Sequence, residues 1–412
     1  NGTNWVVLVA GSNGYYNYRH QADICHAYHV IHDHGIPDEN IIVMMYDDIA
    51  NNELNPKKGF IRNKPNGPNV YPNVLKDYTG DEVSPQNFLG ALSGSKALEE
   101  KGKKVVKSTA EDHIFVYFAD HGAPGLIAFP IGELSATAFN KVLNKMYDEN
   151  RYKKMVIYIE ACESGSMFEN LLSPNINIYA TTAANSTESS LACYWDSELE
   201  TYLGDVYSVK WIEDSDKPSL RDEKLVQQYL KVKKETNTSH VCEFGDMSMH
   251  PLPLSEFQGN KIAEKEYAEV TESPITDAVK SEDVPLLIAK HKAKYSLKNV
   301  RQYIQMVKGR RYMHKKVEMI AETISQFTDF SLTQLMNTKD SIKDHQCYDN
   351  LRETFKKHCF NFSKHPYALR YLYVLVNFCN SVNKDIEMIA KASKEMEIVC
   401  LTNNDNLFER IE

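Results

Sequence analysis

The sequence predicts an open, three-layer α/β domain followed by a small all-helical domain. Over the first 210 residues, short apolar runs alternate with segments of helical periodicity, and this alternation is typical of a mainly parallel sheet covered by helices. Beyond about residue 299 the apolar residues recur at helical spacing, which indicates a helical bundle. The intervening stretch is charged and interrupted by prolines, as connectors often are. We therefore expect an α/β domain over 1–260, a linker over 261–299 and a helical domain over 300–412.

Five strands are predicted in the first domain, all rich in β-branched and aromatic residues. Apolar runs without polar alternation indicate strands that are buried on both faces of a sheet. The runs are WVVLVA (5–10), IIVMMY (41–46), HIFVYF (113–118), MVIYIE (155–160) and INIYAT (176–181).

Three helices are expected between these strands. The first spans 20–35 and ends at Gly35, the second spans 84–100 after the start signal Ser84-Pro85, and the third spans 135–149. Residues 51–74 are dense in Asn, Pro and Gly, which predicts a long ordered surface loop.

The composition is that of an ordinary globular protein. With 42% hydrophobic and 25% charged residues, the chain has no composition typical of disorder or of a fibrous repeat. The longest apolar run, YLYVLVNFC at 371–379, is shorter than the roughly 18–20 residues that cross a bilayer, so we expect no membrane span. The chain begins at NGTNW without a basic-then-apolar leader, and we expect any signal peptide to have been removed.

Charge is unevenly distributed along the chain. The net charge of −9 argues against a general nucleic-acid binder, because phosphate binding needs a cationic face. Residues 1–260 hold 23 Lys and Arg against 35 Asp and Glu, a net charge of −12, whereas residues 261–412 hold 24 against 21, a net charge of +3. Two bodies of opposite charge could dock electrostatically.

The cysteines and the N-glycosylation sequons give a first indication of the cellular compartment in which the protein matures. Four sequons together favour passage through the secretory route. Four cysteines in the helical domain allow three disulfide connectivities, which the sequence leaves open. These cysteines are Cys347, Cys359, Cys379 and Cys400, and the sequons start at Asn1, Asn185, Asn237 and Asn361.

Chemistry is expected at the carboxyl ends of the strands, where functional groups gather in open α/β sheets. His121 follows one predicted strand and Cys162 follows the next. A thiol becomes a good nucleophile as a thiolate, and an imidazole is its natural proton partner. Gly122 and Gly165 lie beside them and leave room for a substrate backbone and for exposed N–H groups, which could stabilise an oxyanion.

Other interpretations of these residues are weaker. Cys162 could be a buried packing residue, as free cysteines often are. A serine nucleophile at Ser164 or Ser166 lacks the first glycine of the G-x-S-x-G elbow. A metal site on the first helix would use Cys25, His26, His29 and His32, but no established ligand spacing accompanies them, and we expect surface and packing histidines. The basic run at 308–316 is expected to be a solvated or docking helix face.

Several blocks of the sequence carry a family resemblance over nearly the whole chain. The blocks are NWVVLVAGSNGYYNYRHQAD (4–23), VYFADHGAPG (116–125), YIEACESGSMFE (158–169), YATTAAN (179–185), TYLGDVYSVKWIEDSD (201–216) and YALRYLYVLVNFC (367–379). They resemble the legumain family, the asparaginyl endopeptidases also called vacuolar processing enzymes, and the resemblance implies a caspase-like peptidase domain.

The resemblance assigns roles to individual residues. It implies Cys162 as nucleophile, His121 as general acid and base, Asn17 as the residue that positions the histidine, and the N–H groups of Gly122 and Cys162 as the oxyanion hole. The specificity pocket that it implies consists of Arg19, His20, Glu160, Ser189, Ser190 and Asp205. Opposite charges around one primary amide suit asparagine, which offers one acceptor and two donors.

The trailing domain matches the family too, so the resemblance implies a zymogen. Its helical prodomain would cap the active site until autocleavage at low pH, for which Asn260 and Asn299 are the candidate positions. The charge difference fits a cap that docks at neutral pH and weakens as carboxylates protonate. The resemblance further implies two disulfides, Cys347–Cys379 and Cys359–Cys400.

The resemblance also sets expectations for partners and location. The implied partners are peptides and proteins with exposed asparagine, the chain's own prodomain as an intramolecular inhibitor, and cystatin-type inhibitors. No cofactor, metal or nucleic acid is expected. The implied location is an acidic, lysosome-like or vacuole-like compartment, or secretion.

Two other functions are compatible with the same residues. A peptide ligase would use the same acyl-enzyme but let an amine replace water. A catalytically silent binding protein would have lost the nucleophile or the base, and both residues are present.

Overall fold

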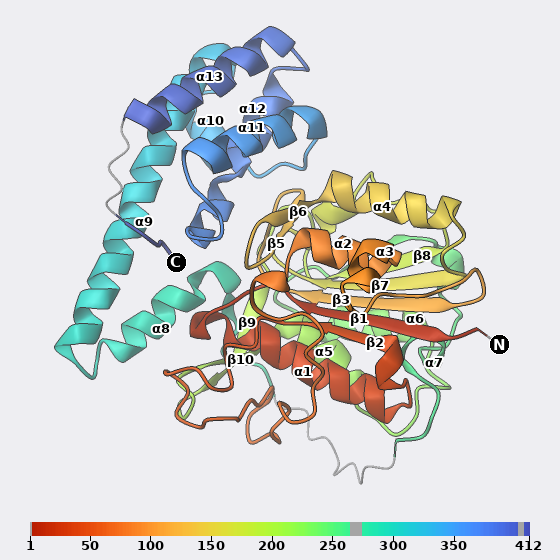
Figure 1. Ribbon diagram of the computed structural model, residues 1–412. Helices are drawn as coiled ribbons and strands as arrows, with labels where there is room; N and C mark the ends of the chain where they lie inside the picture. The colour runs from red at the N-terminus through yellow and green to blue at the C-terminus, as the bar shows by residue number, and fades with distance from the viewer. Residues whose placement is uncertain (1, 264–273, 403–407) are drawn as a thin grey trace. The chain divides into compact units, whose positions relative to one another are not determined.

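The structure is a computed structural model that describes residues 2–263, 274–402 and 408–412 (Figure 1). The chain forms two compact units. The first comprises the residues up to His121 together with Ile127–Ser281, and the second comprises Gly122–Leu126 together with Glu282–Glu412.

The strands are β1 Asn4–Ala10, β2 Ile41–Met44, β3 His113–Ala119, β4 Gly122–Ala123, β5 Leu126–Ala128, β6 Glu133–Ser135, β7 Lys154–Glu160, β8 Ile178–Thr182, β9 Leu191–Asp196, β10 Thr201–Asp205, β11 Cys242–Gly245 and β12 Val279–Lys280. The helices are α1 Tyr18–Asp33, α2 Pro85–Ser93, α3 Lys96–Glu100, α4 Ala136–Asp148, α5 Val206–Ser215, α6 Leu225–Glu235, α7 Ser255–Gln258, α8 Val284–Lys292, α9 Leu297–Ile324, α10 Leu332–Asn337, α11 His345–His358, α12 Tyr373–Ser381 and α13 Ile386–Thr402.

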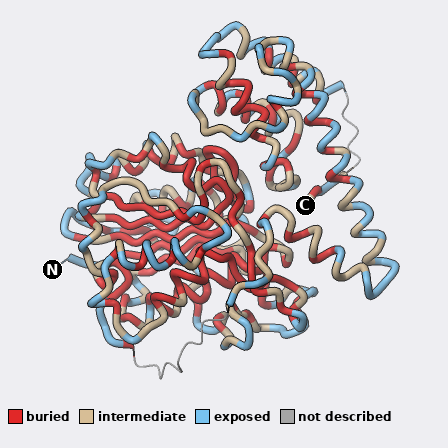
Figure 2. The backbone as a smooth tube through the Cα atoms, turned by 180° about the vertical axis from the view of Figure 1, so that it is seen from behind, coloured by how far each residue is buried: buried red, intermediate tan, exposed pale blue. Residues whose placement is uncertain are grey.

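The first unit is built on a six-stranded sheet in the order β11-β8-β7-β3-β1-β2. All neighbouring strands run parallel except β11, which pairs antiparallel with β8. The central strands are buried along nearly their whole length (Figure 2). One hydrophobic core lies between the sheet and α1, α5, α6 and α7, and a second lies between the opposite face and α2 and α4. The predicted three-layer, mainly parallel α/β fold is thus confirmed.

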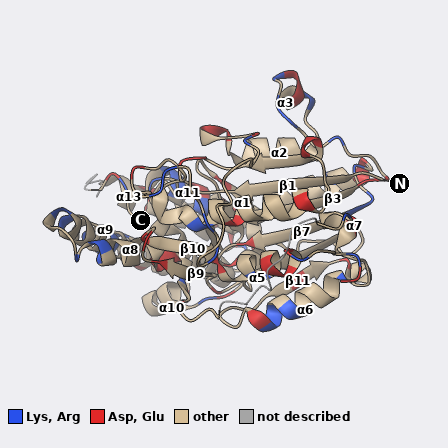
Figure 3. Cartoon of the chain, turned by 90° about the horizontal axis from the view of Figure 1, so that it is seen from below, with Lys and Arg blue, Asp and Glu red and all other residues tan. Residues whose placement is uncertain are grey.

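The five predicted strands correspond to β1, β2, β3, β7 and β8. Charged residues lie mainly on the helices and loops around the sheet (Figure 3), whereas β1 and β3 contain no Asp, Glu, Lys or Arg and β7 has such residues only at its ends. The sequence pattern therefore located the buried sheet well. The strands β9 to β12 and the small sheet β4-β5-β6 were not predicted.

The predicted single helix over 84–100 is wrong, because it is divided into α2 and α3. Gly94 ends α2 with a left-handed backbone, φ +74°, a conformation that glycine adopts without steric cost. A Cβ at this position would lie 2.6 Å from the Val106 carbonyl oxygen. Ser95 then caps α3 by accepting a hydrogen bond from the Leu98 N–H.

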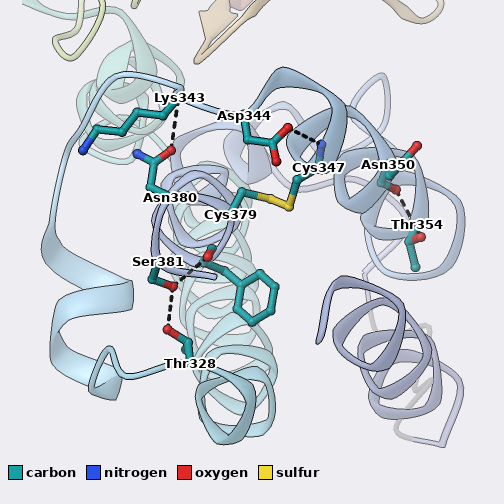
Figure 4. The surroundings of a disulfide bond; sticks show 10 residues. Thr328, Lys343, Asp344, Cys347, Asn350, Thr354, Cys379, Asn380 and Ser381 are labelled. Carbon is teal, nitrogen blue, oxygen red and sulfur yellow. Dashed lines mark hydrogen bonds between the residues drawn. A yellow bond between two sulfur atoms is a disulfide. The ribbon is translucent and has the colours of Figure 1, made fainter. Parts of the chain in front are cut away.

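The second unit is helical, as predicted, and carries both disulfides that the family resemblance implied. Cys347 in α11 is bonded to Cys379 in α12 (Figure 4), and Cys359, at the end of α11, is bonded to Cys400 in α13. The Asp344 side chain caps α11 by accepting from the Cys347 N–H at 3.0 Å. Among the described residues, no helix is long and apolar enough to span a membrane.

The basic run 308–316 lies in α9 and is only partly the solvated face that was expected. Arg310 and Lys316 are buried. The Arg310 guanidinium stacks over the Tyr367 ring at 3.9 Å, and the Lys316 ammonium donates to the Val399 carbonyl at 3.1 Å. These two cations therefore hold the helices of the second unit together.

Candidate active site

The two predicted reactive residues come from neighbouring strands in matching register. Ala119 at the end of β3 pairs with Glu160 at the end of β7, and the Asp120 N–H donates to the Glu160 carbonyl at 3.0 Å. His121 and Cys162 each lie two residues beyond that aligned pair. The parallel pairing of β3 and β7 thus delivers both residues to one edge of the sheet, as the strand-end rule predicts.

Hydrogen bonds fix the tautomer of His121. Its Nε2 lies 2.8 Å from Oδ1 of Asn17, while Nδ2 of Asn17 donates to the Asn13 carbonyl at 2.9 Å. Because the amide nitrogen of Asn17 already faces an acceptor, the oxygen faces the ring and must accept. Nε2 therefore carries the hydrogen in the neutral ring, and the lone pair is on Nδ1.

Cys162 lies at a sharp turn that the next residue makes possible. Glu163 has a left-handed backbone, φ +52°, and its N–H donates to the Glu188 carbonyl at 2.7 Å. The Cys162 side chain is buried, with Sγ 3.6 Å from the hydroxyl of Ser190. Non-glycine residues in this conformation are uncommon and often belong to functional turns.

The side chains of the two serines that follow Cys162 stabilise the turn through hydrogen bonds. The Ser164 hydroxyl donates to the Ala184 carbonyl at 3.4 Å and accepts from its N–H at 3.1 Å, and the Ser166 hydroxyl donates to the Glu163 carbonyl at 2.5 Å. Gly165 packs so tightly that a Cβ would lie 3.0 Å from the backbone of Asn185 and Ser186. These contacts support a structural role for Ser164 and Ser166 and argue against the serine-nucleophile alternative.

Arg19, at the start of α1, is a fully buried cation. Its Nε donates to Oδ1 of Asp205 at 2.9 Å, Nη1 donates to the Tyr16 carbonyl at 3.2 Å, and Nη2 donates to the Ser281 hydroxyl at 2.5 Å. Asp205 ends β10, so an ion pair links the start of α1 to the second sheet.

His20 follows Arg19 and is completely buried. Its Nδ1 lies 2.6 Å from the Ser12 hydroxyl, and its Nε2 lies 3.6 Å from Oδ2 of Asp205. Burial and the neighbouring Arg19 charge hold the pKa of His20 well below its usual range. His20 is therefore a neutral imidazole at neutral and mildly acidic pH.

Several carboxyl groups are buried around this cation. Burial raises the pKa of Asp120, Glu160 and Asp205 above the ordinary range. Oε2 of Glu160 accepts from both the N–H and the hydroxyl of Ser208, at 2.9 and 3.0 Å. The arrangement combines one permanent cation with carboxyls that retain protons more readily than exposed ones do.

Sequence reasoning missed part of this network. Asp23 is fully buried, and its Oδ1 accepts from Nδ2 of Asn63 at 2.7 Å. A signal existed, because Asp23 lies four residues after Arg19 and so on the same face of α1. Ser208 and Ser281 had no signal of this kind, since their partners lie 48 and 262 residues away. Ser12 lies only eight residues before His20 but precedes α1, so helical spacing does not relate the two.

A short strand from the predicted linker lies beside these residues. β12 pairs antiparallel with β9, with Val279 opposite Ala192 and Lys280 opposite Leu191. Ser281 continues this pairing through its N–H, which donates to the Ser190 carbonyl at 3.1 Å. Since the Ser281 hydroxyl also accepts from Arg19, the linker reaches the candidate pocket.

Asp277, two residues before β12, fixes the start of this segment. This side chain accepts from the N–H groups of Tyr194 and Trp195, at 3.0 and 2.5 Å. The segment around β12 is therefore an ordered added strand of the β10-β9-β12 sheet.

The histidines of α1 do not form the metal cluster that the sequence had raised as an alternative. Cys25 packs against the Met45 sulfur, His26 contacts Asn63, His29 contacts the Val70 carbonyl, and His32 pairs with Asp38. Within the described ranges, the one metal-compatible group is His20, Asp120 and His121, whose ligand atoms lie within 4.8 Å of one another. Both of its imidazoles already have protein partners, Ser12 and Asn17.

The remaining predicted positions lie in different surroundings. Ser189 is buried next to Ser190, and Gly122 begins β4 directly after His121. Asn260 is exposed, whereas Asn299 is half-buried in the first turn of α9 and donates to the Lys292 carbonyl at 2.9 Å. Of the sequon asparagines, Asn237 and Asn361 are exposed, Asn185 is half-buried, and Asn1 lies outside the described residues.

Comparisons with known proteins show the family to which the sequence is similar. Residues 4–260 match the model of the Peptidase C13 family, and residues 301–396 match that of the legumain prodomain. The chain is 48% identical to legumain from Mus musculus over 414 residues, covering 98% of this chain and 93% of that protein. It is 48% identical to legumain from Homo sapiens (92% and 89% covered) and 44% identical to the vacuolar-processing enzyme delta-isozyme from Arabidopsis thaliana (96% and 90% covered).

Caspase-1 is one of the solved structures that match, with low sequence identity. Caspase-1 from Spodoptera frugiperda aligns with a TM-score of 0.36 and 9% identity, over 63% of this chain and 90% of that chain.

Proposed function

The chain belongs to the legumain family of cysteine endopeptidases, and on that premise we propose that it hydrolyses peptide bonds on the carboxyl side of asparagine. The observation that carries this proposal is the buried Arg19–Asp205 pair beside Glu160. A primary amide needs one donor for its oxygen and acceptors for its two N–H groups. Arg19 supplies the donor, while Asp205 and Glu160 supply the acceptors.

The remaining pocket residues complete the site in this proposal. In this proposal His20, Ser189 and Ser190 line the pocket, and the Ser190 hydroxyl lies 3.6 Å from the Cys162 thiol. The pocket distinguishes asparagine from ionised aspartate because the second substrate oxygen would face protein carboxylates. Acid relaxes the distinction, since a protonated aspartate side chain can donate as an amide does. We therefore expect cleavage after aspartate only at low pH.

The chemistry follows from the tautomer of His121. With its Nε2–H held by Asn17, the ring offers Nδ1 to take the thiol proton of Cys162. The thiolate attacks the backbone carbonyl carbon of the asparagine, and the N–H groups of Gly122 and Cys162 stabilise the oxyanion. The imidazolium then returns its proton to the leaving amine, which gives an acyl-enzyme.

In the hydrolase reaction, water attacks the acyl-enzyme. His121 takes a proton from water, the hydroxide attacks the acyl carbon, and the Cys162 thiol is regenerated. A peptide ligase is the second candidate, because an incoming amine could attack the same acyl-enzyme. Mass spectrometry of products from an asparagine peptide mixed with excess amine-bearing peptide separates the two, since only ligation adds the mass of the second peptide.

The helical region matches the legumain prodomain and is an intramolecular inhibitory prodomain. In the proposed zymogen, the β12 segment contributes to inhibition, because an extended peptide substrate could pair with the same edge of β9. The Ser281 hydroxyl already uses one hydrogen-bond donor of Arg19. Activation therefore requires that this segment leave the pocket.

We propose autocleavage at low pH after Asn260 or Asn299. Asn260 is exposed and its carbonyl accepts from Arg221 at 2.8 Å, so it is accessible without unfolding a helix. Cleavage after Asn299 requires the first turn of α9 to open, because proteases bind extended chains. Acid conditions fit the acidic lysosomal or vacuolar compartments that the relatives' family implies.

The test is to acidify the full chain and follow its mass and its activity on otherwise identical peptides with Asn, Asp or Ala before the scissile bond. We expect self-processing, cleavage of the Asn peptide, and cleavage of the Asp peptide only in the acidic buffers. Cys162→Ala should abolish both processing and turnover, and Ser164→Ala is the matched control for a nearby nucleophile. An unchanged Asn/Asp ratio between near-neutral and acidic buffer contradicts the pocket chemistry.

A further inference from the structure

Asp23 is a buried titratable group to which the proposed mechanism gives no task. It lies in α1 and is fully buried. Its Oδ1 accepts from Nδ2 of Asn63 at 2.7 Å, and the same amide nitrogen donates to the Leu203 carbonyl at 3.0 Å. Both hydrogens of the Asn63 amide are thereby used on acceptors, so its Oδ1 accepts from Nδ1–H of His26 at 2.9 Å. Asn63 thus fixes the orientation of the Asp23 carboxyl.

The second carboxyl oxygen of Asp23, Oδ2, is buried near the Asp205 carboxyl. The Asp23 carboxyl lies against the end of β10, because a Cβ on Gly204 would lie 3.0 Å from its Oδ1, and Asp205 is the next residue of that strand. Oδ2 of Asp23 and Oδ2 of Asp205 are both buried and have no hydrogen-bond partner among the described residues. Two ionised carboxylates are acceptors only and cannot satisfy one another. A single proton between them would satisfy both oxygens.

Charge balance favours the same conclusion. Asp23, Asp120, Glu160 and Asp205 are all at most 2% exposed, and the one permanent cation among them is Arg19. Burying several unbalanced negative charges is very costly. Arg19 binds Asp205 directly, which stabilises the anion there. The shared proton therefore belongs on Asp23.

We propose that Asp23 is a positioning residue for specificity, which holds a proton and donates it in a hydrogen bond to Asp205, so that Asp205 stays oriented as the ionised acceptor for the substrate amide. The inference rests on the proposed asparagine specificity for its functional consequence. The proton itself is a property of the fold and is tested without substrate.

The pH dependence follows from the groups that surround Asp23. These are Tyr117 on β3, Glu160 on β7, Cys193 on β9 and Asp205 at the end of β10. Arg19 and His20 on α1 act on Asp23 through Asp205, which both of them contact. Burial and the Asp205 charge raise the pKa of Asp23 well above its usual range. For a raised acid, the stabilising proton is present below the unfolded pKa and is lost as pH rises through the folded pKa. The pocket should therefore lose both order and asparagine recognition on the alkaline side.

Asp23→Asn is the informative variant, because it replaces the proton with a permanent donor of the same shape. Its Oδ1 can still accept from Asn63 and its Nδ2 can donate to Asp205 at every pH. Asp23→Ala removes the donor and the acceptor together. Asp112→Asn is the matched control, since the Asp112 carboxylate accepts only, from the N–H groups of Thr3 and Thr109 and the Thr109 hydroxyl.

The first readout is the melting temperature of the full chain against pH, with Cys162→Ala in all variants to prevent self-cleavage. We expect the melting temperature of the parent to fall from acidic to alkaline buffer. The fall should be smaller in Asp23→Asn, by about 3 °C or more. Asp112→Asn should lower the melting temperature at all pH values. Parallel pH curves for the parent and Asp23→Asn overturn the shared proton.

The second readout is the kinetics of asparagine-peptide cleavage after acid activation of the full chain. Asp23→Ala should raise KM and lower kcat/KM about tenfold or more. Asp23→Asn should restore most of this loss. In the same variant the alkaline limb of the kcat/KM profile should move to higher pH by about one unit. Equal defects in both variants, or an unmoved alkaline limb, overturn the specificity role. If no asparagine peptide is cleaved by the parent, the proposed function fails while the melting curves still decide the proton.

Discussion

Replacing Asn17 by alanine should slow catalysis without weakening substrate binding. The Asn17 side chain is buried and its Oδ1 accepts from Nε2 of His121 at 2.8 Å. Asn17 is the N-cap residue of α1, but its side chain makes no capping bond. The substitution therefore removes the histidine contact and the bond to the Asn13 carbonyl while the helix start is retained.

The size of the effect follows from the change of charge on His121. A hydrogen bond between neutral groups contributes about 0.5–1.5 kcal/mol and one to a charged group about 1.5–3 kcal/mol. The imidazole is neutral before proton transfer and cationic afterwards. Asn17 therefore stabilises the charged state by about 1–1.5 kcal/mol more than the neutral state, which corresponds to about a tenfold loss of kcat in Asn17→Ala.

The assay is steady-state cleavage of an asparagine peptide by the acid-activated chain, with separate kcat and KM. We expect kcat to fall about tenfold and KM to stay within about twofold. Asn87→Ala is the matched control, because Asn87 in α2 also donates from Nδ2 to a backbone carbonyl, that of Glu82, at 2.8 Å. The reasoning is refuted if kcat is unchanged, if the loss appears in KM, or if Asn87→Ala gives an equal loss.

Three further predictions concern the zymogen and the buried charges. Ser281→Ala removes a hydrogen bond to the Arg19 cation, so the residual peptidase activity of the unprocessed chain should rise about tenfold. The activity is measured before acidification, and Lys280→Ala, at an exposed neighbouring position, is the control. Removing the Cys359–Cys400 bond by double serine substitution releases a loop of 41 residues. The chain-entropy relation then gives a loss of about 4 kcal/mol in the free energy of unfolding of the second unit. An unfolding transition of this unit that stays at the same denaturant concentration would contradict this. Arg19→Lys should abolish asparagine cleavage, because lysine lacks the planar fork of donors, and a retained kcat/KM within about threefold would contradict the pocket assignment.

The opposing pKa shifts also predict how stability varies with pH. Asp120 and Glu160 have pKa values raised by burial, so their contribution is present at acidic pH and lost as pH rises through the folded pKa. His20 has its pKa lowered by burial, so its contribution is present above the ordinary histidine pKa and lost as pH falls. Because the raised carboxyls outnumber the histidine, we expect the full chain to melt at a higher temperature near pH 5 than near pH 8. A scanning-fluorimetry series over that range checks the sign.

Local sequence patterns predicted the central sheet and that His121 and Cys162 follow adjacent strands. The runs of β1, β3 and β7 are uninterrupted by charge because both faces of the sheet are covered. Since these strands are parallel, the residues that follow them meet at one edge. His121 and Cys162 could therefore be paired from their positions after strands, and the family resemblance added the pocket residues and the two disulfides.

What the sequence alone determined is the set of elements whose signal lies within a few residues: the buried strands, the main helices, and a thiol and an imidazole after adjacent strands. The tertiary structure decided which distant side chains share one buried space. Arg19 meets Ser281 across 262 positions, and Asp23 meets Asn63 across 40. No local pattern encodes such pairs, because they depend on the register of β9, β10 and β12 and on the packing of α1. The charge state of the pocket depends in turn on that burial, so Asp23 acquires its proposed role only in the folded chain.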